Sequence, residues 1–132
     1  MEKKKILVVD HSPFILTVMN NMLSELNYEV TTAESGFEAQ KHVEATKHDM
    51  IITDLHMPGM SGIELTRLVK QMPDRRFIPI VMLSCEGDEE KIAEAKRMGV
   101  STFLRKPVKD SQLKAILQVA MGLLSSSQSA KP

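Results

Sequence analysis

The stretch that decides the fold is residues 50–64, which read MIITDLHMPGMSGIE. The apolar run at its start leads to Asp54, and a loop with a Pro-Gly pair follows. Ser61 and Glu64 then have the spacing of a capping box, the reciprocal side-chain-to-backbone pairing that starts a helix. The stretch therefore predicts a buried strand, an acidic side chain at the carboxyl end of that strand, and a helix after the loop.

This strand-and-helix unit recurs along the chain. Strand-like apolar runs occur at 6–9, 29–32, 50–52, 80–83 and 102–104. Helix starts are predicted at Ser12-Pro13, at capping boxes 35–38 and 61–64, and at Asp88, whose helix ends near Met98 with Gly99 as its stop. Apolar stripes at helical spacing lie at 15, 19, 22 and 26, and at 113, 116, 117, 120 and 124. Regular alternation predicts an α/β fold with a parallel sheet covered by helices on both faces.

The polarity of the five runs predicts the order of the strands. The first, third and fourth runs are apolar throughout, as strands buried on both faces are. Polar residues in or beside the second and fifth runs are typical of edge strands, and they are Glu29, Thr31, Thr32, Arg105 and Lys106. Edges at strands two and five predict a doubly wound, flavodoxin-like (βα)5 sheet in the order 2-1-3-4-5. The alternative order 3-2-1-4-5 would place the apolar third strand at an edge.

Composition limits the class of protein. The 132 residues have the size of one domain, which we expect at 1–124, followed by a disordered tail or the start of a linker at 125–132. Seventeen basic and seventeen acidic residues give zero net charge, which argues against direct binding of nucleic acid by a chain-wide basic surface. A membrane span needs about 18 apolar residues, and no run approaches that length. We therefore expect no membrane insertion. Because Cys85 is the single cysteine and cannot form an internal disulfide, we expect a cytoplasmic domain.

Polar side chains follow four of the predicted strands. Asp10 follows the first, Asp54 the third, Ser84 the fourth and Lys106 the fifth. Ligands of open α/β sheets bind at this carboxyl edge, where the strand order reverses between strands one and three. Two adjacent carboxylates favour a hard divalent cation such as Mg²⁺, and a lysine and a hydroxyl suit phosphate oxygens. The set predicts phosphoryl-transfer chemistry, whereas the lack of a glycine-rich loop after the first strand disfavours nucleotide binding.

These residues give the chain a family resemblance. It resembles the receiver domain of two-component response regulators, in the single-domain chemotaxis-regulator (CheY-like) form. The resemblance covers roughly residues 4–124, and the motifs that carry it are ILVVD at 6–10, DLHMPGMSG at 54–62, Ser84, and Lys106-Pro107. It implies a signalling switch rather than an enzyme, because receiver domains promote only their own phosphorylation and dephosphorylation.

The resemblance implies a role for each matching residue of the acidic site. Asp54 would accept a phosphoryl group from a sensor histidine kinase, a phosphotransfer protein or a small acyl phosphate. Asp10, Asp54 and the backbone carbonyl of His56 would hold Mg²⁺. Lys106 would contact the phosphoryl group, and Ser84 would move to hydrogen-bond to it.

The resemblance also implies how the signal would leave the domain. Phe103 matches an aromatic switch residue that rotates inward with the shift of Ser84. The Lys106-Pro107 bond would be cis, as proline permits. A downstream protein would dock on the face of the fourth helix, fifth strand and fifth helix, where Val119 and Leu123 add apolar surface for output docking or a homodimer.

One position departs from the family. Receiver domains usually have two adjacent acids after the first strand, whereas this chain has Asp10-His11. Imidazole in place of a carboxylate removes a charge and a hard oxygen ligand, so Mg²⁺ should bind more weakly, and Mn²⁺ is an alternative ion for which His11 is a candidate ligand. The alternative function is therefore a phosphorylation-independent protein-interaction module. A flavin-binding domain of this topology would need a hydroxyl-rich phosphate loop and stacking aromatics that the chain lacks. His42 and His48 are predicted on the surface.

Overall fold

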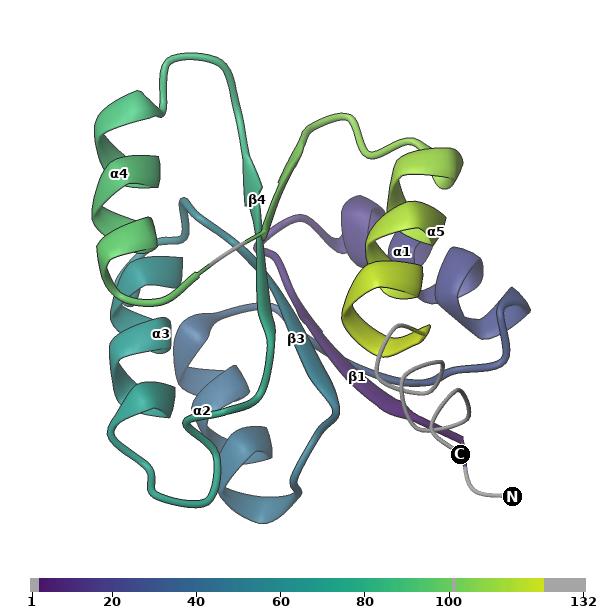
Figure 1. Cartoon of the computed structure of the whole chain (residues 1–132), viewed down its shortest axis with the longest axis horizontal. Coiled ribbons are helices and arrows are strands. Elements are labelled where there is room, and N and C mark those ends of the chain that lie inside the picture. Colours follow the sequence, from purple (N-terminus) through teal and green to yellow (C-terminus); the bar gives the residue numbers. More distant parts are fainter. Residues whose placement is uncertain (1–2, 101, 123–132) are drawn as a thin grey trace, which may run out of the picture.

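A single parallel sheet forms the centre of the molecule (Figure 1). The computed structural model describes residues 3–100 and 102–122, so the predicted tail at 125–132 lies outside the described residues. The five strands are Lys5–Val9 (β1), Glu29–Ala33 (β2), Met50–Asp54 (β3), Ile80–Ser84 (β4) and Thr102–Arg105 (β5). Their order is β2-β1-β3-β4-β5, which confirms the predicted topology. Val8 of β1 lies opposite Thr32 of β2 and Ile52 of β3.

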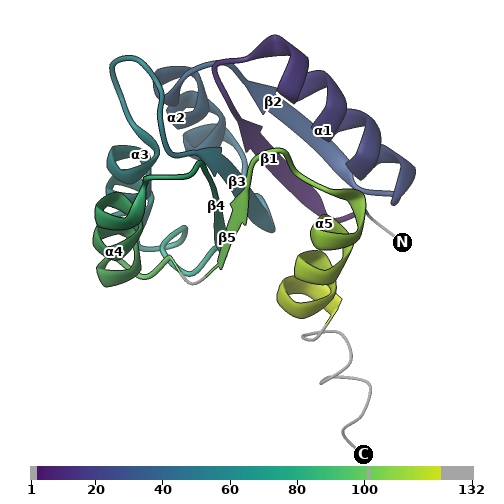
Figure 2. The same ribbon diagram turned by 90° about the horizontal axis from the view of Figure 1, so that it is seen from above.

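Helices cover both faces of the sheet, as Figure 2 shows. On one face lie α1 (Pro13–Glu25) and α5 (Asp110–Leu117), which continues into a short π-helical segment, η1 (Gln118–Gly122). On the other face lie α2 (Gly36–Ala45), α3 (Gly62–Lys70) and α4 (Glu89–Arg97). This two-sided cover is what right-handed β-α-β crossovers of a doubly wound sheet produce.

The core consists of two apolar layers, one on each side of the sheet. Because successive strand residues point to opposite faces, Ile6 and Val8 of β1 pack on the α1–α5 side, and Leu7 and Val9 pack on the α2–α4 side. Every residue of β3 and β4 is buried, whereas β2 and β5 are partly exposed. The prediction of β2 and β5 as edge strands is confirmed.

The capping boxes form as predicted at α3 but only in part at α2. At α3, the Ser61 hydroxyl accepts from the Glu64 N–H and the Glu64 carboxylate accepts from the Ser61 N–H. At α2, Ser35 accepts from the Glu38 N–H, but the Glu38 carboxylate accepts from the N–H of Glu34, one residue earlier. The helix nevertheless begins after Ser35, where the sequence predicts.

The buried stripe of α1 is rotated from the predicted one. Leu16, Met19 and Leu23 are buried, while Ile15 and Met22 are only partly buried. Ile15, Met22 and Leu26 of the predicted stripe still pack against this core, so the helix faces the sheet as predicted, with its most buried positions about one residue further along. The end of α4 agrees with the prediction, because Gly99, at φ +103°, follows its last turn.

His48, predicted on the surface, is buried between α2 and β3. Only 3% of the residue is exposed, and its Nδ1 atom has no hydrogen-bond partner among the described residues. Burial, reinforced by the nearby charges of His42 and Lys5, lowers the pKa of His48 from its ordinary value of 6.5.

Within residues 3–100 and 102–122, no helix is long and apolar enough to cross a lipid bilayer.

Candidate functional site at the carboxyl edge of the sheet

Three of the predicted site residues meet at the carboxyl edge of the sheet. The Nζ atom of Lys106 lies 2.9 Å from Oδ2 of Asp10 and 3.2 Å from Oδ2 of Asp54. Asp10 is fully buried and Asp54 is 2% exposed. One ammonium group between two buried carboxylates offsets their mutual repulsion.

The same contacts raise the pKa of Lys106. Burial acts in the opposite direction, but the hydrogen bond to Asp10 and the charges of Asp54 and Asp10 outweigh it. Lys106 is therefore a fixed positive charge at neutral pH, placed beside the predicted phosphoacceptor.

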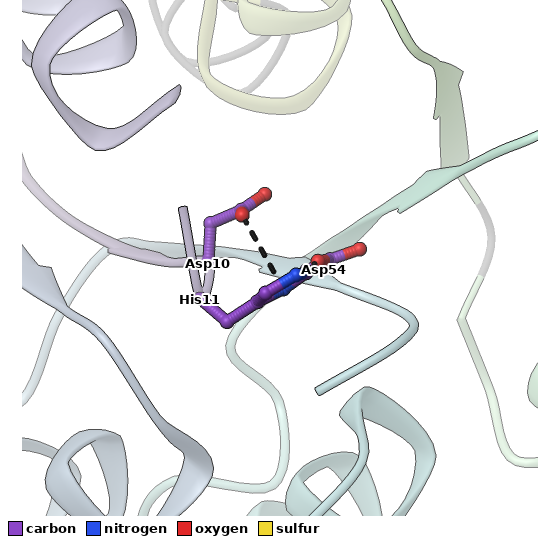
Figure 3. A group of neighbouring side chains, drawn as sticks. All are labelled: Asp10, His11 and Asp54. Atoms are coloured by element: carbon purple, nitrogen blue, oxygen red, sulfur yellow. Dashed lines mark hydrogen bonds and ion pairs between the residues drawn. The ribbon is translucent and has the colours of Figure 1, made fainter. Parts of the chain in front are cut away.

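His11 adds an imidazole to the two carboxylates. Its Nδ1 atom lies 3.1 Å from Oδ2 of Asp54 and 3.8 Å from Oδ1 of Asp10 (Figure 3). One ligand atom from each of the three residues lies within 4.8 Å of the others. Two carboxylate oxygens and one imidazole nitrogen at this spacing fit a divalent cation.

The loop between β3 and α3 fixes the backbone beside Asp54. The Gly62 N–H donates to the carbonyl of Leu55 at 3.1 Å, so the loop returns to the strand that it leaves. A Cβ atom at position 62 would lie 2.2 Å from the carbonyl oxygen of Asp54. Only glycine permits this approach, which explains the Ser-Gly pair at the end of the motif. The Asp54 carboxylate also accepts from the N–H of His56 at 3.3 Å.

Ser84 lies at the carboxyl end of β4 beside Lys106, whereas Phe103 lies in β5 opposite Met82 of β4. Ser84 is the last residue of β4 and is buried, and its carbonyl accepts from the Lys106 N–H at 2.8 Å. Phe103, in β5, is half-buried against the α2–α4 layer, and the Lys96 amine lies 5.9 Å from the centre of its ring. The Lys106–Pro107 peptide bond is cis, as predicted.

Asp88 has a different partner from the predicted one. It precedes α4, but its side chain makes no capping hydrogen bond there. Instead, Oδ1 of Asp88 lies 2.7 Å from Nε2 of His56, and Oδ2 accepts from the Cys85 N–H at 2.7 Å. Burial alone would raise the pKa of Asp88, but the contacts with Cys85 and His56 lower it overall.

The contact between His56 and Asp88 was not predicted from the sequence. Helical periodicity and capping patterns describe neighbours within one segment, whereas these residues are 32 positions apart. A signal was nonetheless present, because His56 follows β3 and Asp88 follows β4, and the two strands are adjacent in the predicted order.

Similarity to known proteins identifies the family of this chain. The chain matches the response regulator receiver domain over residues 6–118. It belongs to the response regulator receiver family. It is 38% identical over 122 residues to chemotaxis protein CheY1 of Helicobacter pylori, a match that covers 89% of this chain and 97% of the relative. It is a CheY-like receiver domain, the type of module that acts in two-component signalling.

Solved receiver structures have the same fold. The chemotaxis response regulator CheY4 of Vibrio cholerae superposes with a TM-score of 0.85 at 35% identity, covering 91% of this chain and all of that one. The receiver domain of sensor histidine kinase PA1611 from Pseudomonas aeruginosa gives a TM-score of 0.83 at 31% identity, covering 92% and 99%. In that structure a magnesium ion is coordinated in the active-site cleft. The acidic cluster of this receiver domain is compatible with Mg²⁺ and with phosphorylation.

Proposed function

We propose that this receiver domain is a phosphoacceptor switch that is phosphorylated on Asp54 and signals by altered protein–protein contacts. The phosphoryl donor is a sensor histidine kinase or a phosphotransfer protein. The observation that carries the proposal is the position of the buried Asp54 carboxylate, 3.2 Å from the Lys106 ammonium group at the carboxyl edge of the sheet. The ammonium group balances the negative charge of the carboxylate and so reduces its repulsion of an incoming phosphoryl dianion. A buried carboxylate with such a neighbour is therefore suited to accept the phosphoryl group.

The transfer converts one phosphate bond into another. A carboxylate oxygen of Asp54 attacks the phosphorus of a phosphohistidine, an O–P bond forms, the N–P bond breaks, and the imidazole leaves with a proton from solvent. Lys106, already beside both carboxylates, hydrogen-bonds to the incoming phosphoryl oxygens. A divalent cation held by Asp10, Asp54 and the backbone carbonyl of His56 would supply further positive charge there when bound.

The output follows from the residues around the phosphoryl group. We expect Ser84 to hydrogen-bond to the phosphoryl oxygens and Phe103 to change rotamer, which alters the face formed by α4, β5 and α5. We expect Val119, which is exposed in η1 directly after α5, to add apolar surface for a downstream protein or for a second copy of the chain. Like the kinases and output proteins that it would contact, the domain would act in the cytoplasm.

His11 distinguishes this switch from receivers with two adjacent acids. It places a neutral nitrogen ligand where a carboxylate would attract Mg²⁺, and it occupies space 3.1 Å from Asp54. We therefore expect phosphorylation to require more Mg²⁺ than an acidic side chain at position 11 would.

Incubation with acetyl phosphate over a Mg²⁺ series tests the proposal. Intact-mass spectrometry should detect one phosphoryl group on the wild type and none on Asp54→Asn. Asp74→Asn, which removes an exposed carboxylate far from the site, is the matched control and should be modified like the wild type. The proposal fails if the wild type stays unmodified at high Mg²⁺ and with its kinase, or if Asp54→Asn is modified equally.

A second candidate function is a phosphorylation-independent interaction module. The observation that favours it is the hydrogen bond between His11 Nδ1 and Asp54, which engages the predicted phosphoacceptor from within the chain. Partner binding that survives Asp54→Asn, together with no modification of the wild type in the acetyl phosphate series, would support this function over the switch.

A further inference from the structure

We propose that the His11 imidazole is a direct metal ligand and that the site takes a first-row transition-metal dication in preference to Mg²⁺. This inference rests on the cation site of the proposed function and deepens it. It assigns a ligand and a class of ion rather than only a weaker affinity for Mg²⁺.

The spacing of the donor atoms suits a metal ion. Ligands at right angles about 2.1 Å from a metal lie about 3 Å apart. Nδ1 of His11 lies 3.1 Å from Oδ2 of Asp54 and 3.8 Å from Oδ1 of Asp10. The two separations that involve His11 are thus near this value, and the three donor atoms all lie within 4.8 Å of one another, as ligands on one face of an octahedral site require after a small approach. Small rotations of the half-exposed His11 side chain are enough to complete it.

The charge of the site favours selectivity through a nitrogen ligand. Asp10, Asp54 and Lys106 together carry one net negative charge when all three are ionised. An acidic residue at position 11 would double that charge and attract every dication more strongly, whereas a neutral imidazole adds no Coulomb attraction. What His11 offers is a coordinate bond to nitrogen, which transition metals form readily and Mg²⁺ forms poorly. The substitution therefore changes the selectivity of the site as well as its affinity.

The carboxylates of Asp10 and Asp54 are held in place by burial and by backbone hydrogen bonds. Both are nearly fully buried, the Ser12 N–H donates to Oδ1 of Asp10 at 2.9 Å, and the His56 N–H donates to Oδ1 of Asp54 at 3.3 Å. The imidazole of His11, which is half-exposed, lies close to both of these carboxylates (Figure 3). A mixed set of two oxygens and one nitrogen forms without rearrangement of the strands, and solvent supplies the remaining ligands.

Binding of Mn²⁺ to the full-length chain tests this inference. Mn²⁺ lies at the weak end of the order of transition-metal affinities, so a preference for it over Mg²⁺ is a conservative test. Free Mn²⁺ is counted by electron paramagnetic resonance during titration, with Mg²⁺ as the competitor. Electron spin-echo modulation then reports whether a ¹⁴N nucleus is coordinated to the bound ion. Neither measurement needs phosphorylation.

The variants are His11→Asp, His56→Gln and His42→Asp. We expect ¹⁴N modulation in the wild type that is lost in His11→Asp and kept in the other two variants. His42 lies on α2, so His42→Asp makes the same change of residue outside the site and serves as the control. The ratio of Mg²⁺ to Mn²⁺ dissociation constants should fall by at least about tenfold in His11→Asp, since ligand changes alter metal affinity by that order.

The inference is overturned if bound Mn²⁺ shows no ¹⁴N coupling, if the coupling depends on His56, or if the ratio of dissociation constants is unchanged in His11→Asp. Its failure is separate from that of the proposed function. A domain that binds Mg²⁺ as well as Mn²⁺ and is still phosphorylated on Asp54 would lose only this inference. A domain with ¹⁴N-coordinated Mn²⁺ and no phosphorylation would lose only the switch.

Discussion

Nε2 of His56 lies 2.7 Å from Oδ1 of Asp88, and this contact joins the loop after β3 to the residue that precedes α4. The second oxygen of Asp88 accepts from the Cys85 N–H, so the same carboxylate also closes the segment that follows Ser84. In the proposed switch, that segment is the one that moves when Ser84 contacts a phosphoryl group. The pair therefore favours the arrangement seen here over any arrangement that draws the segment away.

Loss of the Asp88 charge should loosen the start of α4. In Asp88→Asn we expect faster amide hydrogen exchange over residues 85–92 and a loss of roughly 1 kcal/mol in the free energy of unfolding, because a partly exposed charged hydrogen bond is worth about that much. Asp110→Asn, which removes an exposed partner of Lys114, is the control. A double-mutant cycle with His56→Gln should reveal coupling between the two residues. Purely additive effects would contradict the pairing.

Gly62 should not tolerate a methyl group. In Gly62→Ala the new Cβ meets the carbonyl oxygen of Asp54, and we expect urea unfolding to show a loss of about 2 kcal/mol, within the range of overpacking costs. The sign of the effect is diagnostic, because alanine otherwise favours a helix over glycine. A Gly62→Ala variant as stable as the wild type would contradict the close approach of α3 to β3.

Sequence patterns could predict the sheet and most of the site because strand polarity and strand order determine both. Asp10, Asp54 and Lys106 meet because each follows a strand of a parallel sheet, and the carboxyl ends of those strands share one edge. The partner of Asp88 was missed, since a carboxylate before a helix fits a cap and an ion pair equally well, although the predicted adjacency of β3 and β4 already placed His56 and Asp88 at one edge of the sheet. Burial of His48 was also missed, because no periodicity marks a loop residue that neighbouring segments cover.

Removal of the Lys106 charge should destabilise the domain. In Lys106→Met the two buried carboxylates face each other without a cation, and we expect a loss of about 2 kcal/mol in the free energy of unfolding at neutral pH. Added Mn²⁺ should raise the melting temperature of this variant more than that of the wild type, because the ion restores the missing positive charge. Equal stability of variant and wild type would show that Lys106 does not balance the acidic pair.

His48 should make stability depend on pH in mild acid. Its pKa is lowered from 6.5 in the folded state, mainly by burial, so the unfolded chain binds more protons as the pH falls below that value. Stability contributed by neutral His48 is therefore lost as the pH falls below about 6.5. Urea titrations should show a shallower decrease for His48→Gln over this range and parallel behaviour above about pH 7.5, where His48 is neutral in both states. An unchanged slope in acid would contradict the burial of this imidazole.

The proposed switch depends on conversion of the buried Asp54 carboxylate to an acyl phosphate. Borohydride reduces an aspartyl phosphate to homoserine, so treatment after acetyl phosphate and divalent cation marks the modified position permanently. Peptide mass spectrometry should find homoserine at position 54 in the wild type and nowhere in Asp54→Asn. Homoserine at another aspartate, or none at saturating Mg²⁺ and Mn²⁺, would contradict the account.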